Sequence, residues 1–186
     1  MTAVQGRAPP EVAYDLLIED GGRNYIHTPI SNYPDYNLSA SETLLANPNV
    51  IMGLGDAGAH VGFILDAGFP TWLLTYWGRQ KKRWPLEELV RRLTSDTAKA
   101  AGLGDRGRIA AGLKADLNVI DYDRLGFGRP YVTHDLPAGG KRLLQKAAGY
   151  DTTVLSGQIT YRHGEPTGAL PGRVVKGQRA KQSKAA

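Results

Sequence analysis

Residues 49–61 constrain the fold of this chain more than any other stretch. They begin with an apolar run, 50–54, and continue with residues that are nearly all small. An apolar run of this length favours a buried parallel strand that is covered on both faces. Asp56 follows the run between Gly55 and Gly58, so its carboxylate is expected just past the C-terminal end of a strand, where α/β barrels carry catalytic groups. The alternative is a tight turn in which Asp56 caps the next helix, and this segment alone favours neither.

Helix and strand patterns alternate over the first hundred residues. Helices are predicted from Pro9 to before Gly21, from Ser39 to before Pro48, over 71–77, from Pro85 to Leu93 and from Ser95 to Ala101. The evidence is proline at first helical positions, a capping-box pattern at 39–42, an N-cap serine at 95 and leucines at helical spacing after Pro85. Short strands are predicted over 25–30 and 50–54. Such alternation indicates an α/β fold with a parallel sheet.

The pattern changes after residue 105. Residues 107–112 are typical of a tight glycine turn, and residues 115–121 alternate apolar and polar side chains as a strand does. Residues 152–155 and 158–162 form a predicted hairpin with Gly157 at its turn. The C-terminal part is therefore predicted to be antiparallel β.

The net charge of +5 comes from the C-terminal end. Of the 23 basic residues, five lie in 167–186, and the remaining 18 equal the acidic residues in number. A basic, polar end of this kind is typical of a solvated, disordered tail. Nucleic-acid binding is the disfavoured alternative, because no aromatic residues are interleaved for stacking on bases.

No apolar run approaches the roughly 18 residues of a membrane span, and no membrane association is expected. Residues 1–7 lack the apolar core of a signal peptide, and the chain has no cysteine. These features are compatible with a reducing compartment, and a cytoplasmic location is predicted.

Two segments carry a resemblance to a known family. Residues 93–98, Leu-Thr-Ser-Asp-Thr-Ala, and residues 102–121, from Gly-Leu-Gly-Asp-Arg-Gly to Asp-Leu-Asn-Val-Ile-Asp, resemble the C-terminal signature of the metal-dependent amidohydrolase superfamily. Within it the chain is most similar to the N-acyl-D-amino-acid deacylase (D-aminoacylase) branch. The resemblance covers roughly 45–175 and is most specific at 106–117. It departs from the family at Thr97, usually proline, and at 56–60, where many deacylases have Ser-Asp-Gly.

The resemblance implies a composite fold. Residues 1–104 would be the last strand–helix units of a (β/α)8 TIM-type barrel. Residues 105–172 would be strands of a small β-sandwich, and 173–186 the basic tail. Asp105, Arg106, Asp116 and Asp121 are expected to be structural, holding turns and the junction between the two parts.

By the same resemblance, Asp56 matches the aspartate at the end of the eighth barrel strand. That residue takes a proton from the attacking water and returns it to the leaving nitrogen, beside a divalent metal, for which zinc is expected. Asp56 is thus the expected catalytic residue, and a metal ligand only in a completed barrel. His60 is expected to contact the substrate carboxylate or carbonyl oxygen, with a helix-start or packing role as the alternative.

The family's metal ligands are largely missing. The His-x-His pair does not occur, and the four histidines, His27, His60, His134 and His163, are widely separated. Zinc sites need about three protein ligands, whereas Asp56 is the one good candidate here and His27 a weak second. The chain is therefore expected to begin inside the barrel, and to need the missing N-terminal barrel portion or self-association.

The function implied is metal-assisted hydrolysis of a linear amide, such as deacylation of a small N-acyl amino acid. Alone, the chain is expected to bind zinc poorly and to be inactive. A non-catalytic interaction or scaffold fragment without a metal site is the alternative.

Overall fold

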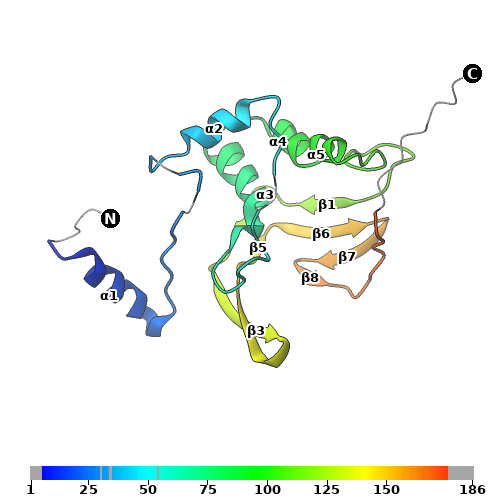
Figure 1. The fold of residues 1–186 in the computed structure, drawn as a ribbon. Helices are drawn as coiled ribbons and strands as arrows, with labels where there is room; N and C mark the ends of the chain where they lie inside the picture. Colours follow the sequence, from blue (N-terminus) through cyan, green and yellow to red (C-terminus); the bar gives the residue numbers. More distant parts are fainter. Residues whose placement is uncertain (1–5, 30, 34, 54, 176–186) are drawn as a thin grey trace, which may run out of the picture. The chain divides into compact units, whose positions relative to one another are not determined.

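The chain was analysed as a computed structural model that describes residues 6–29, 31–33, 35–53 and 55–175. It forms two compact units, Met1–Val50 and Ile51–Ala186, whose elements are drawn in Figure 1. Most of the basic tail, from 176 onward, lies outside the described residues. None of the described helices has the length and hydropathy to cross a membrane.

The first unit contains helices α1, Pro9–Gly22, and α2, Ser39–Ala46. Both were predicted. The regular part of α1 stops before Glu19, because Asp20 and Gly21 have φ angles of 53° and 67°. The start of α2 differs from its predicted capping box: the N-cap residue is Leu38, which has no side-chain cap bond, and the Ser39 N–H donates to Asn37 Oδ1 at 2.9 Å. Neither helix contains a buried residue.

The two predicted strands in the first part of the chain are not found. Residues 24–29 and 50–53 have no regular secondary structure, and Ile30 and Leu54 lie outside the described residues. A parallel strand needs neighbours on its edges and cover on both faces. Within the described part of the chain, no parallel neighbour exists for either segment. The apolar composition of residues 50–53 therefore does not make them a strand in this structure, and Ile51 is 51% exposed.

A continuous helical segment supplies part of the core of the second unit. It comprises the 3-10 turn η1, Asp66–Gly68, helix α3, Phe69–Trp72, and the π-helix η2, Leu73–Gln80. Leu73, Leu74 and Trp77 are buried, and the Trp77 ring packs edge-on against Trp84 with centroids 5.4 Å apart. The predicted helix at 71–77 is thus confirmed and extends beyond both ends.

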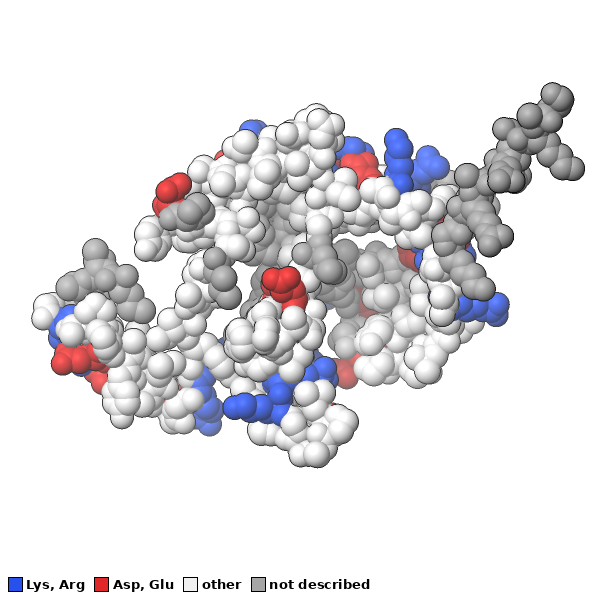
Figure 2. All heavy atoms as spheres, in the orientation of Figure 1, with Lys and Arg blue, Asp and Glu red and all other residues white. Residues whose placement is uncertain are grey.

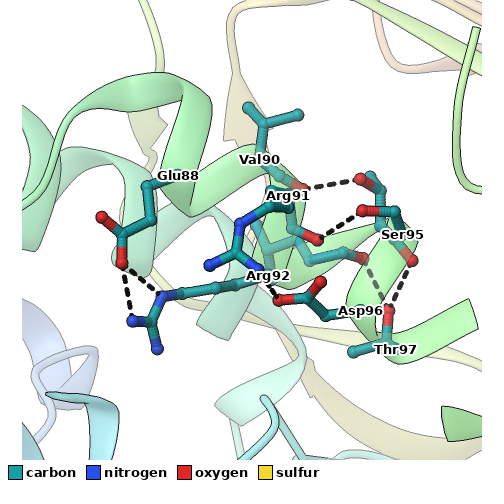
Figure 3. Close-up of polar contacts among 9 residues, drawn as sticks. Glu88, Val90, Arg91, Arg92, Ser95, Asp96 and Thr97 are labelled. Carbon is teal, nitrogen blue, oxygen red and sulfur yellow. Dashed lines mark hydrogen bonds and ion pairs between the residues drawn. The ribbon is translucent and has the colours of Figure 1, made fainter. Parts of the chain in front are cut away.

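Helices α4, Leu86–Leu93, and α5, Ser95–Ala100, follow as predicted. Arg91 Nη1 bonds Asp96 Oδ2 at 2.6 Å across the junction (Figure 3). Ser95 is not the N-cap, a position that Thr94 takes; the Ser95 hydroxyl donates back to a carbonyl of α4. The Thr97 hydroxyl donates to the carbonyl oxygen of Leu93 at 3.1 Å, a bond that the proline usual in the family could not make.

The predicted change to antiparallel β after residue 105 is confirmed. The largest sheet has the order β1-β6-β7-β8, and every pairing in it is antiparallel. Its strands are β1, Leu117–Ile120; β6, Tyr150–Leu155; β7, Gln158–Arg162; and β8, Glu165–Pro166. Ser156 and Gly157, with φ of 51° and 80°, form the two-residue turn between β6 and β7, as the sequence predicted.

Two smaller antiparallel pairs complete the described strands. Strand β2, Gly126–Phe127, pairs with β5, Ala147–Ala148. Strand β3, Tyr131–Leu136, pairs with β4, Gly140–Leu144, through the short 3-10 turn η3, Pro137–Gly139. In Figure 1 the β3–β4 pair forms an arm beside the larger sheet.

Acidic and basic side chains stand in several small groups on the face drawn in Figure 2. A cluster of ion pairs joins the α5 region to the sheet. Arg106 bonds Asp116 at 3.1 Å and Asp105 at 3.0 Å, and Asp116 Oδ1 accepts the Ser156 N–H at 2.8 Å. Hydrogen bonds from Arg106 and then Lys114 lower the pKa of Asp105 to about 2. These contacts give Asp105, Arg106 and Asp116 the structural placement that the sequence predicted.

Candidate functional site

The candidate catalytic residue, Asp56, lies in an irregular loop that runs from residue 55 to η1. Its carboxylate is exposed, and its carbonyl oxygen accepts the Ala59 N–H at 3.1 Å. Asp56 therefore begins a turn, as the second interpretation of the sequence expected. It does not cap a helix, because the next helical element starts only at Asp66. The strand of the first interpretation is not found in the described residues 50–53.

Asp66 holds the Asp56 backbone in place. The Asp56 N–H donates to Asp66 Oδ2, and a carboxylate is a stronger acceptor than a neutral oxygen. The other carboxylate oxygen, Oδ1, is buried and has no hydrogen-bond partner in the described part of the chain. The sequence interpretation missed Asp66; its signal is an acidic residue immediately before the predicted helix, ten residues after Asp56.

Gly55 makes this contact possible. A Cβ atom at position 55 would lie 2.7 Å from the Asp66 carbonyl oxygen and 3.2 Å from Phe69 Cδ1. The first distance is too short for a real side chain and the second is tight, so the backbone before Asp56 runs directly against η1 and α3. A glycine allows this close approach, in which the neighbour is the chain itself.

His60 is part of the same loop. It has a φ of 46°, is exposed, and stacks on the Phe63 ring with centroids 5.2 Å apart. Its carbonyl accepts the N–H groups of Phe63 and Ile64 at 3.0 and 3.2 Å. These contacts give His60 a packing role, while the exposed ring stays open to a ligand. No hydrogen bond joins the side chains of His60 and Asp56 in the described part of the chain.

The C-terminal strands support the loop from the other side. The Leu143 N–H on β4 donates to the Val61 carbonyl at 2.8 Å. Gly68 lies so near Phe127 on β2 that a Cβ there would be 2.4 Å from Phe127 Cε1. The Thr71 and Tyr150 hydroxyls are 2.7 Å apart. Strand β4 thus contacts the loop, while residues of β2 and β6 contact the helical segment that follows it.

A divalent metal does not fit the residues described. No group of three or more His, Cys, Asp or Glu side chains able to hold an ion occurs among them. His134 Nδ1 is 3.2 Å from the Gly139 carbonyl, and His163 lies 3.5 Å from Asp151. Zinc needs about three protein ligands, so Asp56 has no partner ligands here.

A separate pocket of about 510 Å³ lies at the C-terminal end of η2. It is lined by Gly78, Arg79, Lys82, Trp84, Pro85, Leu86 and Tyr122. Neither Asp56 nor His60 belongs to its lining. The Arg79 guanidinium donates to the carbonyls of Tyr122 at 2.7 Å, Asp123 at 3.0 Å and Leu125 at 2.7 Å, so its hydrogen-bonding capacity serves the fold.

Comparison with known proteins identifies the family. The model of the Amidohydrolase family matches residues 1–161. The chain belongs to the amidohydrolase family. This amidohydrolase chain is also 30% identical over 174 residues to uncharacterized proteins of Mycobacterium bovis and Mycobacterium tuberculosis, and the alignment covers 87% of it. No solved structure matches.

The relatives are much longer than the chain. The matched region makes up 27% of each mycobacterial protein, so this amidohydrolase chain spans about a quarter of their length. A relative of this length has room for ligands that the described residues lack.

Proposed function

We propose that the chain is the C-terminal portion of a hydrolase that cleaves the carbon–nitrogen bond of a linear amide. The observation that carries the proposal is the family match over residues 1–161. The substrate class we propose is a small N-acyl amino acid, in line with the resemblance to the D-aminoacylase branch. The chain's 1–104 part would complete a barrel and its 105–172 part a β-sandwich in the whole enzyme.

In this proposal Asp56 is the proton-transfer residue. Its exposed carboxylate takes a proton from the attacking water and passes it to the leaving nitrogen as the amide bond breaks. General acid–base catalysis of this kind contributes about 10²–10⁴-fold to the rate. His60, stacked on Phe63 in the same loop, would contact the carboxylate or carbonyl oxygen of the substrate.

The whole enzyme needs more than this chain. The described residues supply no metal-ligand set, so the zinc expected from the family would be held by residues elsewhere in the enzyme. We propose that a polypeptide with the remaining barrel strands, or a further copy of the chain, completes it. Exposed apolar side chains in α1 and α2, including Ile18 and Leu44, and the unpaired edge of β1 among the described strands support this need.

The second candidate is a non-catalytic interaction or scaffold fragment. It is favoured by one observation, the lack of a ligand set around Asp56 in the described residues. The two candidates differ in whether Asp56 matters to a chemical step.

A chimera separates the candidates. In the chimera, the chain replaces the matched region of the Mycobacterium tuberculosis relative. Hydrolysis of N-acyl-L- and N-acyl-D-amino acids is measured as the amount of free amine released. We expect turnover by the relative and the chimera, and its loss in the Asp56→Asn chimera. A relative that is active beside a folded, inactive chimera would favour the scaffold. No turnover by the relative on any such amide would overturn the proposed reaction.

A further inference from the structure

We propose that Asp66 is the positioning residue for Asp56. It acts through the hydrogen bond that its Oδ2 atom accepts from the Asp56 backbone N–H. The inference rests on the proposed catalytic role of Asp56 and adds a second residue to that site. Asp66 does not touch the substrate in this assignment, and it determines where the Asp56 carboxylate is presented.

No strand among the described residues leads into Asp56 and orients it. Residues 51–53 form no strand and have no ladder partner. In an α/β barrel the end of a paired strand orients the catalytic group. Here the contact from Asp66, which closes ten residues of chain, takes that place.

Gly55, the residue before Asp56, lies close against Asp66. A Cβ at this position would lie 2.7 Å from the Asp66 carbonyl oxygen and 3.3 Å from Asp66 Cγ. The residue before Asp56 therefore contacts both the main chain and the side chain of Asp66. This packing is independent of the hydrogen bond, and it requires glycine.

Asp66 belongs to the helical segment that carries buried core residues. It begins η1, which continues without a break into α3 and η2, where Leu73, Leu74 and Trp77 are buried. A site group is held accurately when its supporting residues are part of rigid, packed elements. Asp66 thus connects the irregular loop to the most buried part of the second unit.

The Asp66 carboxylate is partly buried at this contact. Its Oδ1 atom is buried and has no hydrogen-bond partner among the described residues, and an unpaired buried oxygen lowers stability. A buried polar group of this kind calls for an explanation, and the hydrogen bond that Oδ2 accepts from the Asp56 N–H supplies one.

The direct test measures the hydrogen-exchange rate of the Asp56 amide in the 186-residue chain by NMR. We expect Asp66→Ala to speed this exchange at least about tenfold, because the acceptor is lost. Asp66→Asn keeps an oxygen acceptor, so its exchange rate at the Asp56 amide should lie between those of wild type and Asp66→Ala. Asp123→Ala, an exposed aspartate of the same unit, should change nothing at Asp56. Equal exchange at Asp56 in wild type and folded Asp66→Ala would overturn the proposal.

The functional test uses the chimera described above. Misplacing a reacting group by about 1 Å costs about 10²-fold in rate. Asp66→Ala should therefore lower kcat by about that factor with KM within about twofold, and Asp66→Asn should recover part of the loss. A rise in KM with kcat unchanged would contradict a positioning role. If Asp56→Asn leaves turnover intact, the proposed function fails, while the exchange experiment still decides whether Asp66 holds Asp56.

Discussion

The Leu143 N–H on β4 donates a 2.8 Å hydrogen bond to the Val61 carbonyl in the loop that carries Asp56. The candidate site is therefore supported by two distant parts of the chain, the helical segment that begins at Asp66 and the β3–β4 pair. Leu143 is itself buried. The same residue of β4 therefore binds the loop through its backbone and packs into the core through its side chain. A change in the C-terminal strands is thus expected to reach the candidate site through the backbone of the loop.

Asp56→Asn is expected to lower turnover by about 10²–10⁴-fold in the completed enzyme, since the amide cannot act as a base. Folding should be intact, because the Asp56 carboxylate is exposed and only its backbone contacts Asp66. Amide hydrolysis by the chimera, with circular dichroism as the folding check, measures both. Turnover close to that of the parent chimera would refute the assignment.

Leu89→Ala is expected to destabilise the chain by about 2–5 kcal/mol, because it leaves a cavity in the core. Leu89 is 1% exposed, whereas Leu170 is 93% exposed. Leu170→Ala makes the same chemical change at the surface and should stay within about 0.5 kcal/mol of wild type. Urea unfolding of the three proteins provides the comparison, and similar midpoints for both variants would mean that Leu89 is not in the core.

Asp105 is expected to make stability depend on acid pH. Its pKa is lowered from 3.8 to about 2 by hydrogen bonds from Arg106 and Lys114. A lowered folded-state pKa adds stability above the unfolded value, and this contribution is lost as pH falls from 3.8 toward 2. Asp105→Asn should therefore unfold at lower urea than wild type at pH 6, and the gap should narrow below pH 3.8. Asp123→Asn is the control, and a gap that is constant with pH would contradict the prediction.

The 186-residue chain alone is expected to bind zinc in less than stoichiometric amount and to hydrolyse no N-acyl amino acid. The reason is the missing ligand set among the described residues. Metal analysis after dialysis against zinc, with the mycobacterial relative as the comparison, tests this. One tightly held zinc per chain together with amide hydrolysis would show that the chain forms a site by itself.

The chain is expected to self-associate or to exchange quickly in its first unit. Helices α1 and α2 contain no buried residue, and segments with few buried contacts open easily. Light scattering and hydrogen exchange on the 186-residue chain measure the two quantities. A monodisperse monomer with slow exchange throughout α1 and α2 would contradict this expectation.

Local chemistry determined much of the secondary structure. Pro85 and the leucines after it predicted α4, and Gly157 predicted the turn between β6 and β7, because the relevant interactions span only a few residues. The family was also visible in the sequence, in the segment around Arg106 and Asp116, whose ion pair the structure forms. These features depend on neighbours in the chain, which a sequence displays directly.

Tertiary structure decided the rest. Residues 50–53 have the composition of a buried strand, yet a strand exists only where another one pairs with it. The contact of Asp66 with Asp56, and that of Leu143 with Val61, join residues whose separation in sequence carries no periodic signal. The sequence by itself therefore determined the helices, the hairpin and the family. Only the folded chain decided which residues support Asp56, because such support comes from the packing of distant segments.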